Sequence, residues 1–196
     1  MGKIICLMGK SSCGKDTIYK RLLADEELQL VRLVPYTTRP IRIKERDGQD
    51  YHFVDENTYL DMKDKGLILE ERAYDTMHGI WRYFTAGDNE LISGDEVYLY
   101  IGTLEAYVSL CESLGRYNML PIYIEVDDGL RLERALKRER KQEEPKYEEM
   151  CRRFLADSVD FSKEKIKEAS IERSFVNDEL KDCLKAITKY IHENLE

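Results

Sequence analysis

The sequence predicts an α/β fold whose mainly parallel sheet is covered by helices on both faces. Helical segments alternate along the chain with short, continuously apolar segments, which is typical of strands buried on both sides. The first apolar run, residues 3–8, leads into a glycine loop and then into a helical stretch with apolar Ile18, Leu22 and Leu23. With 196 residues and 42% apolar content, the chain fits one compact domain with a small insertion.

Apolar, branched runs predict further strands, which in chain order are residues 30–34, 51–54, 67–71, 97–101, 121–126 and 174–176. Helical periodicity predicts helices at residues 17–24, 57–65, 104–114, 129–141, 146–158 and 178–194. The last of these carries Leu180, Leu184, Ile187 and Ile191 at helical spacing, so we expect one of its faces to pack on the core.

Two segments interrupt the alternation and predict the organisation of the domain. Residues 37–86 contain short, polar-flanked strands, which indicates an inserted substrate-binding subdomain. Residues 129–158 form a highly charged helical pair that is broken by the Glu-Glu-Pro sequence at 143–145, and we interpret it as a mobile lid. The core is then made of residues 1–36, 87–128 and 159–196.

Composition excludes several classes of protein. The formal net charge of −8 disfavours general nucleic-acid binding, and the first apolar run is too short to span a membrane. The five cysteines are scattered without metal-binding spacing, which suits a reducing, cytoplasmic compartment. Basic residues gather at 32–46, including Lys44, and at 131–141; these clusters either suit a small anionic ligand or are ordinary solvated faces.

The stretch GKSSCGKD at residues 9–16 has the GxxxxGK spacing of a phosphate-binding loop. Successive backbone N–H groups at a helix N-terminus favour an anion, and Lys15 adds positive charge for the nucleotide phosphates. The residues expected to bind a nucleotide here are Gly9, Ser11, Ser12, Cys13, Gly14, Lys15, Asp16 and Thr17. The last loop position, normally a magnesium-binding Ser or Thr, is Asp16.

The next stretch, YTTRPIRIKERDGQDYHF, predicts a second anion site. Arg39 and Arg42 would supply planar, bidentate donors to a phosphate, and Tyr51 would add a phenolic donor. Glu45 would hold one guanidinium in place. The alternative is a surface turn around the proline and glycine of this stretch.

With these motifs the chain resembles the guanylate kinase family over nearly its whole length. TTRPIR..E.DG.DYHF at residues 37–53 is similar to that family's most specific signature, and the glycine loop precedes it at the expected distance. LILEE at 67–71 and FVND at 175–178 are similar to two further family segments. The resemblance implies a three-layer P-loop kinase fold with a parallel core sheet, an inserted nucleoside-monophosphate-binding subdomain and a helical lid.

The resemblance also implies a reaction and its residues. ATP would be the phosphoryl donor with Mg²⁺, and GMP or dGMP the acceptor. Arg39, Arg42 and Tyr51 would grip the monophosphate. Glu70 would read the N1–H and N2–H₂ donors of guanine unless it is merely a surface charge, and Asn177 would lie near adenine. The lid arginines, which neutralise the transferring phosphoryl group, would be Arg138 or Arg140 in the first lid helix and Arg153 in the second.

The chain departs from the family pattern in three places. The family's Asp-Ile-Asp is replaced here by Tyr100, Ile101 and Gly102, so one acid that assists magnesium and one that reads guanine are missing. A Tyr-Tyr-Gly-Thr segment is replaced by WRYFT at 81–85, so a tyrosine contact passes to Tyr83 or is lost.

The third departure is Asp16, for which two interpretations stay open. Asp16, with Thr17 beside it, restores the lost negative charge and helps hold magnesium, or Asp16 merely caps the following helix.

These observations lead to one main hypothesis and two alternatives. The main hypothesis is an ATP-dependent kinase of GMP or dGMP whose partners are small-molecule nucleotides, with neither nucleic acid nor membrane. The first alternative keeps the fold and changes the acceptor base, which the altered residues 100–102 and 81–85 permit. The second is an inactive module that binds a protein partner, and the retention of Lys15, Arg39 and Arg42 argues against it.

Overall fold

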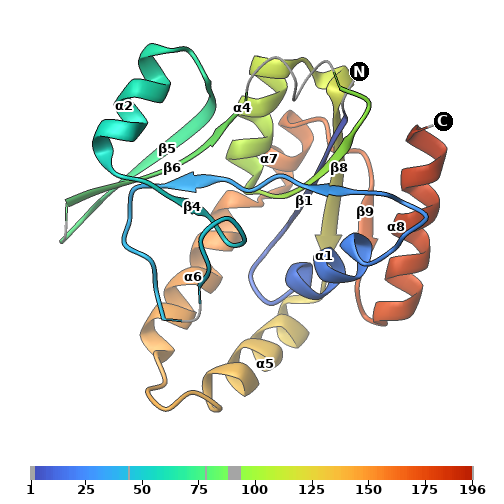
Figure 1. Ribbon diagram of the computed structural model, residues 1–196. Helices are drawn as coiled ribbons and strands as arrows, with labels where there is room; N and C mark the ends of the chain where they lie inside the picture. The colour runs from blue at the N-terminus through green and yellow to red at the C-terminus, as the bar shows by residue number, and fades with distance from the viewer. Residues whose placement is uncertain (1–2, 44, 78, 88–93, 196) are drawn as a thin grey trace.

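The computed structural model describes residues 3–43, 45–77, 79–87 and 94–195. Lys44 of the first basic cluster and residues 88–93 of the expected core lie outside the described part. Within it, a five-stranded sheet with the order β2-β7-β1-β8-β9 forms the centre of the molecule, and each neighbouring pair is parallel (Figure 1). Its strands are β1 (Lys3–Gly9), β2 (Val31–Arg32), β7 (Val97–Ile101), β8 (Met119–Glu125) and β9 (Ser174–Val176). The predicted parallel α/β fold is confirmed.

Helices cover both faces of this sheet. On one face lie α1 (Lys15–Leu23) and α8 (Leu180–Leu195), and on the other lie α4 (Leu104–Leu114), the short 3₁₀ helix Arg116–Asn118 and α7 (Lys163–Glu168) (Figure 1). Because side chains alternate along a strand, β1 serves both layers. Ile5 and Leu7 pack with α1 and α8, whereas Ile4, Cys6 and Met8 pack with α4. This double burial explains why the strands read as continuous apolar runs.

A second, four-stranded sheet is inserted between β2 and β7. Its order is β4-β3-β6-β5, formed by β3 (Tyr36–Thr37), β4 (His52–Phe53), β5 (Ile68–Thr76) and β6 (Gly79–Ala86), with α2 (Glu56–Asp64) beside it (Figure 1). The antiparallel pair β5–β6 is its longest part. The sequence predicts neither β6 nor the extension of β5 beyond residue 71, because this ribbon is half-exposed and rich in charged residues.

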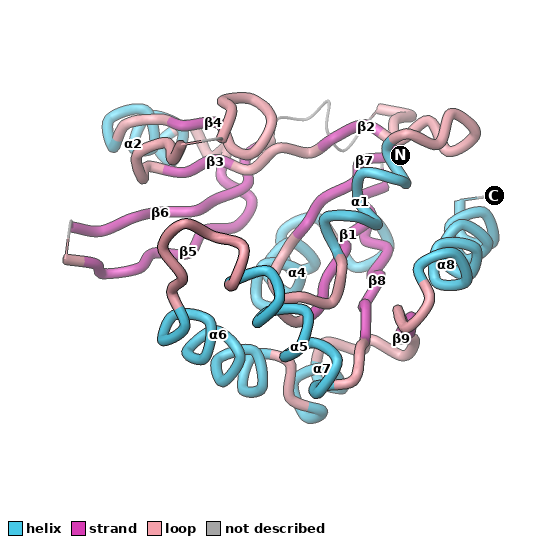
Figure 2. Tube along the Cα trace, turned by 90° about the horizontal axis from the view of Figure 1, so that it is seen from below, coloured by secondary structure: helices cyan, strands magenta, loops and turns pink. Residues whose placement is uncertain are grey.

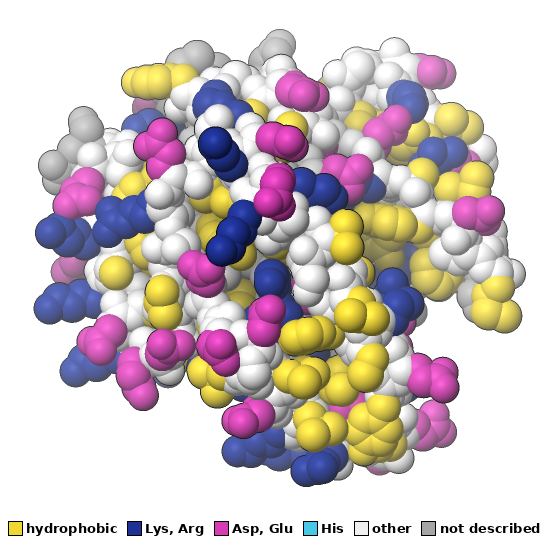
Figure 3. Space-filling model, turned by 180° about the vertical axis from the view of Figure 1, so that it is seen from behind, with side chains coloured by type: hydrophobic (Ala, Val, Ile, Leu, Met, Phe, Trp, Pro, Cys, Tyr) yellow, Lys and Arg dark blue, Asp and Glu magenta, His cyan; other side chains and the backbone are white. Residues whose placement is uncertain are grey.

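Two helices, α5 (Asp128–Glu139) and α6 (Tyr147–Asp160), form a pair at one end of the molecule (Figures 1 and 2). The buried positions of α5 are Arg131, Ala135 and Glu139, which are spaced by four residues and share one face. Helix α6 has no fully buried residue and exposes Tyr147, Leu155 and Val159. Figure 3 shows hydrophobic side chains gathered over this end, with mixed charges elsewhere on the same face.

Helix α7 is absent from the sequence prediction. Its six residues, KEKIKE, contain a single apolar side chain and so present no helical periodicity. The helix begins where the Ser162 side chain accepts a hydrogen bond from the Lys165 N–H. No helix in the described part of the chain is both long enough and apolar enough to cross a bilayer.

Candidate active site

The glycine loop between β1 and α1 is fixed by the ends of two neighbouring strands. Gly9 has φ 152°, and a Cβ there would lie 2.5 Å from the Ile124 carbonyl oxygen of β8. Gly14 has φ 92°, and a Cβ there would lie 2.5 Å from Asn177 Nδ2, just after β9. The same Nδ2 donates to the Cys13 carbonyl at 2.7 Å. Glycine is therefore required at both loop positions, for backbone conformation and for space.

The loop presents groups that suit a phosphate. Lys15 opens α1 and folds over the loop, where its Nζ donates to the Gly9 carbonyl and, at 3.0 Å, to the Lys10 carbonyl. Ser12 has a left-handed backbone with φ 65°, and its buried hydroxyl has no hydrogen-bond partner among the described residues. A buried unpartnered donor and a lysine at a helix N-terminus are what an anion would satisfy, so the loop residues fit a nucleotide phosphate.

A carboxylate from α6 lies against this loop. Asp157 accepts hydrogen bonds from the Ser11 backbone N–H at 2.8 Å and from the Ser11 hydroxyl at 3.3 Å. Behind it lies Arg131 of α5, only 1% exposed, with its Nη1 3.6 Å from Asp157 and its guanidinium over the Phe154 ring. The three guanidinium nitrogens make no hydrogen bond to any described residue. The helix pair thus contacts the loop through an acid and carries a buried arginine next to it.

Among the described residues, none of the three arginines predicted for the lid makes a hydrogen bond or an ion pair with the loop. Arg138 is exposed on α5, and Arg140 is exposed directly after the end of this helix. Arg153 is exposed on α6 and pairs with Glu149 at 2.7 Å; hydrogen bonds from Arg152 and then Arg153 lower the pKa of Glu149 to about 2. Arg131 was not singled out from the sequence. The signal that identifies it is its position on the buried face of α5, four residues before Ala135.

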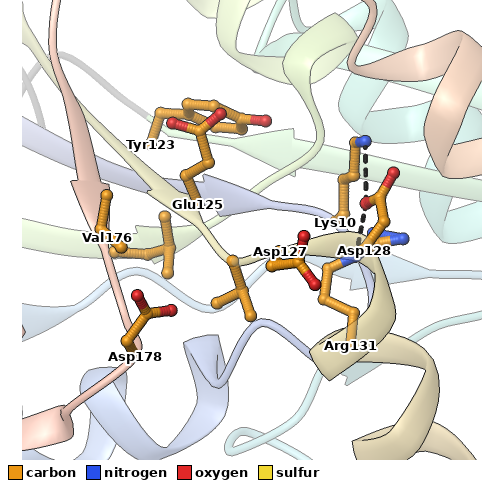
Figure 4. Close-up of a pocket in the computed structure, with 10 residues that line it drawn as sticks. Lys10, Tyr123, Glu125, Asp127, Asp128, Arg131, Val176 and Asp178 are labelled. Atoms are coloured by element: carbon orange, nitrogen blue, oxygen red, sulfur yellow. Dashed lines mark hydrogen bonds and ion pairs between the residues drawn. The ribbon is translucent and has the colours of Figure 1, made fainter.

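Beside the loop, a cavity of about 390 Å³ opens between β8, β9 and α5. Figure 4 shows Lys10 and Arg131 reaching the Asp128 carboxylate, at 3.3 Å and 3.2 Å respectively. Glu125, Asp127 and Asp178 also line this cavity (Figure 4). Asn177, predicted to lie near adenine, donates its side-chain amide to the Cys13 carbonyl of the loop.

At the second predicted anion site, Arg39 is 3% exposed and is held on several sides. Its Nη1 and Nη2 donate to the two Glu45 carboxylate oxygens at 2.7 Å and 2.6 Å, and its Nε donates to the Tyr83 hydroxyl at 3.1 Å. Its guanidinium also lies over the Tyr51 ring. The expected contact between Glu45 and a guanidinium is therefore present, and it rests on a buried side chain rather than on a surface turn.

The neighbouring groups of this site remain open to a ligand. Arg42 is exposed, and its hydrogen bonds to Glu45 are made by the backbone: its N–H donates to the Glu45 carboxylate at 2.9 Å, and its carbonyl accepts from the Glu45 N–H at 3.0 Å. Burial raises the pKa of the Tyr51 phenol, so this side chain stays a protonated donor at neutral pH. Arg42 and Tyr51 therefore keep donor atoms that Glu45 does not occupy.

Glu70 lies in a buried cluster between the two sheets. Its side chain is 0% exposed, which rules out the alternative of a surface charge. It pairs with Arg72, whose Nε lies 3.1 Å from Oε2, and it accepts from the hydroxyls of Thr85 at 2.8 Å and Tyr100 at 3.3 Å. Arg72 also donates to Thr103 at 3.3 Å, which joins this cluster to the start of α4.

The Tyr100 ring and Gly102 are packed closely together. A Cβ on Gly102 would lie 2.5 Å from Cε1 of the Tyr100 ring and 3.1 Å from Cys6 Sγ. The Tyr100 ring, which is 1% exposed, therefore occupies the space that a side chain at position 102 would need.

The predicted magnesium residues lie at the start of α1. Asp16 and Thr17 are both exposed in its first turn, and the N-cap residue Gly14 provides no side-chain cap. Among the residues that the structure describes, no three His, Cys, Asp or Glu side chains gather as a metal site. A magnesium ion here would depend mainly on nucleotide phosphates and water, as this ion often does.

Comparison with known proteins agrees with this architecture. A family model described as guanylate kinase matches residues 1–194. The chain is 35% identical over 83 residues to the guanylate kinase of Anaplasma phagocytophilum and 32% identical over 157 residues to that of Paraburkholderia xenovorans. These alignments cover 42% and 79% of this chain, but only 40% and 65% of the relatives' own length.

A crystal structure of guanylate kinase from Anaplasma phagocytophilum superimposes with a TM-score of 0.66 at 21% identity, covering 99% of this chain and 86% of that one. The glycine loop at the carboxyl end of the central strand of a parallel sheet, with an inserted mixed sheet, defines a P-loop fold of the nucleotide-kinase type. The match over residues 1–194 is more specific: the chain belongs to the guanylate kinase family.

The Arg39–Glu45 pair leads to a pH-dependent prediction. The hydrogen bond from Arg39 lowers the pKa of Glu45 below its ordinary value of 4.5, so the pair stabilises the fold above that pH and the contribution is lost as pH falls through the lowered pKa. In urea unfolding, we expect Glu45→Gln to be less stable than wild type at pH 7 and the difference to shrink below pH 4.5. Glu143→Gln, in the turn between α5 and α6, is the control. A difference that does not vary with pH contradicts the prediction.

The Asp157–Ser11 contact predicts competition with a nucleotide. A phosphate oxygen and the Asp157 carboxylate would use the same Ser11 N–H and would repel each other, so we expect Asp157→Ala to bind ATP about tenfold more tightly, the equivalent of one hydrogen bond. Titration calorimetry measures the affinity, and thermal unfolding checks the fold. Asp160→Ala, on an exposed position of the same helix, serves as the control. Unchanged or weaker ATP binding by Asp157→Ala argues against competition.

Proposed function

We propose that the protein transfers the γ-phosphoryl group of ATP to the monophosphate of GMP or dGMP. The observation that carries the proposal is the presence of two separately built cationic sites, the glycine loop with Lys15 and the clasped Arg39 with Arg42. Membership of the guanylate kinase family supports this reaction. A protein-binding module would have no physical need for both sites.

In this proposal the core, residues 1–36, 87–128 and 159–196, binds ATP. The loop N–H groups and Lys15 hold the phosphates, and the cavity beside Lys10 receives the adenosine, with Val176 and Asp178 in its wall. Mg²⁺ supplies charge neutralisation between the phosphates. Asp16 and Thr17, on the first turn of α1, are the residues that would hold it, directly or through water.

Residues 37–86 form the acceptor subdomain. Glu45 and Tyr83 orient Arg39, and Arg42 and Tyr51 offer their donors to the acceptor phosphate. The guanidinium geometry fixes the direction of that phosphate, which is what an in-line transfer requires.

Residues 129–158 form the lid. Closure of α5 and α6 over the donor phosphates would exclude water and limit hydrolysis. Three lid arginines are proposed to contact the phosphates, namely Arg138, Arg140 and Arg153. Because they are exposed in this structure, closure of the helix pair is needed to bring them to the phosphates. Arg131 is already beside the loop, and displacement of Asp157 would leave it facing the phosphates.

A turnover assay with ATP, Mg²⁺ and a panel of nucleoside monophosphates tests the function. We expect phosphorylation of GMP and dGMP, and we expect Lys15→Ala to lower kcat/KM by about 10²–10³-fold, because it removes a charged donor from the transferring phosphoryl group. Lys20→Ala, on an exposed position of the same helix, should leave the rate unchanged. Turnover of other monophosphates but not GMP would favour the alternative acceptor, and no turnover of any monophosphate would favour the inactive module.

A further inference from the structure

Glu70 accepts four hydrogen bonds from neighbouring side chains, and they are shared unevenly between its two oxygens. A carboxylate offers about four lone-pair sites in two oxygens. Oε1 accepts from Thr85 Oγ1 at 2.8 Å, Tyr100 Oη at 3.3 Å and Arg72 Nη2 at 3.3 Å, and Oε2 accepts from Arg72 Nε at 3.1 Å. Oε2 therefore keeps one lone-pair site, but the Glu70 side chain is 0% exposed, so a base that presents N–H donors can reach this carboxylate only if a neighbouring side chain moves aside.

Displacing Arg72 is unfavourable because the ion pair is buried. The Glu70 side chain is 0% exposed and that of Arg72 is 13% exposed, so separating them leaves a charge with little water to solvate it. Arg72 is further tied to Thr103 Oγ1 at the first turn of α4. The guanidinium is thus a fixed part of this cluster rather than a loose surface chain.

The neighbouring positions offer no replacement carboxylate. Tyr100 fills the space next to Gly102, where a Cβ would lie 2.5 Å from the tyrosine ring. Glu71, the next residue of β5, is engaged elsewhere, with Lys63 at 2.6 Å and with the Tyr59 hydroxyl. Arg72, with 13% of its side chain exposed against 0% for Glu70, is therefore the member of the pair that a base can reach first.

We propose that Arg72 determines base specificity by donating to the acceptor atoms of a 6-oxopurine, so that GMP and IMP are accepted alike. A guanidinium fork matches the O6 and N7 acceptors of a 6-oxopurine. Adenine presents a donor at position 6, which Arg72 would repel. The 2-amino group alone distinguishes guanine from hypoxanthine. Its recognition would need the Glu70 carboxylate, which is buried behind Arg72, so this group is not recognised. This inference rests on the proposed function and defines its substrate class.

Substitution of Arg72 tests the proposal through the ratio of kcat/KM for GMP to that for IMP, with AMP as a third acceptor. We expect the wild-type ratio to lie within about threefold of one, and Arg72→Met to raise it at least about tenfold, because Glu70 then becomes free to accept one more hydrogen bond from the 2-amino group. Arg82→Met is the matched control, since this arginine lies on the paired strand β6 and pairs with Glu56 at 2.7 Å instead. It should leave the ratio unchanged.

Glu70→Gln gives an independent result if Arg72→Met does not fold. If the carboxylate does not contact the base, this variant keeps the wild-type ratio of kcat/KM for GMP to that for IMP; a fall of about tenfold or more in this ratio overturns the proposal. A wild-type preference of about 100-fold for GMP over IMP also overturns it.

Equilibrium dissociation constants for GMP and IMP, measured by calorimetry, keep the two proposals separable. Absence of turnover with every monophosphate would end the proposed function. Even then, equal binding of GMP and IMP would support the role of Arg72, and unequal binding would overturn it.

Discussion

The attachment of the glycine loop to the carboxyl ends of β8 and β9 is the constraint on which the rest of the structure depends. Gly9 approaches the Ile124 carbonyl too closely for any side chain, and Asn177 binds the loop backbone at Cys13. The loop is therefore held by the sheet before any ligand arrives. Because its shape is preformed, the N–H groups at the start of α1 converge without the entropic cost of ordering a flexible segment.

The same constraint explains the position of the helix pair. Asp157 can accept the Ser11 N–H only because the loop already presents that donor outward. The acid takes a place that is suited to an anion, and Arg131, buried behind it, compensates its charge. The contact between α6 and the core is consequently electrostatic and sensitive to a competing anion, whereas the sheet below it is held by apolar packing on both faces.

Two buried pairs of a carboxylate with a guanidinium shape the acceptor region, and they have opposite consequences. In the first, the Glu45 carboxylate holds the Arg39 guanidinium in one orientation. In the second, Arg72 occupies Glu70, so the arginine modifies what the acid can recognise. A resemblance at the level of motifs does not distinguish these cases. The motif contains the acid at position 70 whether or not an arginine pairs with it.

Features that depend on neighbouring residues were predicted from the sequence, and features that depend on contacts between distant residues were not. The glycine loop, the parallel core and the family were predicted correctly, because glycine spacing, apolar runs and signature motifs are local. Strand β6 and helix α7 were missed because one is half-exposed and the other lacks periodicity. The contacts of Asp157 with Ser11 and of Arg72 with Glu70 and Thr103 were also missed; the first joins residues 146 positions apart, and no local pattern encodes it.

A crystal structure with a non-hydrolysable ATP analogue and GMP bound together tests the central claim most directly. The account predicts the triphosphate in the preformed loop with Asp157 moved off Ser11, and the monophosphate on Arg42 and Tyr51 beside the Arg39–Glu45 pair. An empty loop, or an acceptor phosphate bound away from these arginines, would contradict it.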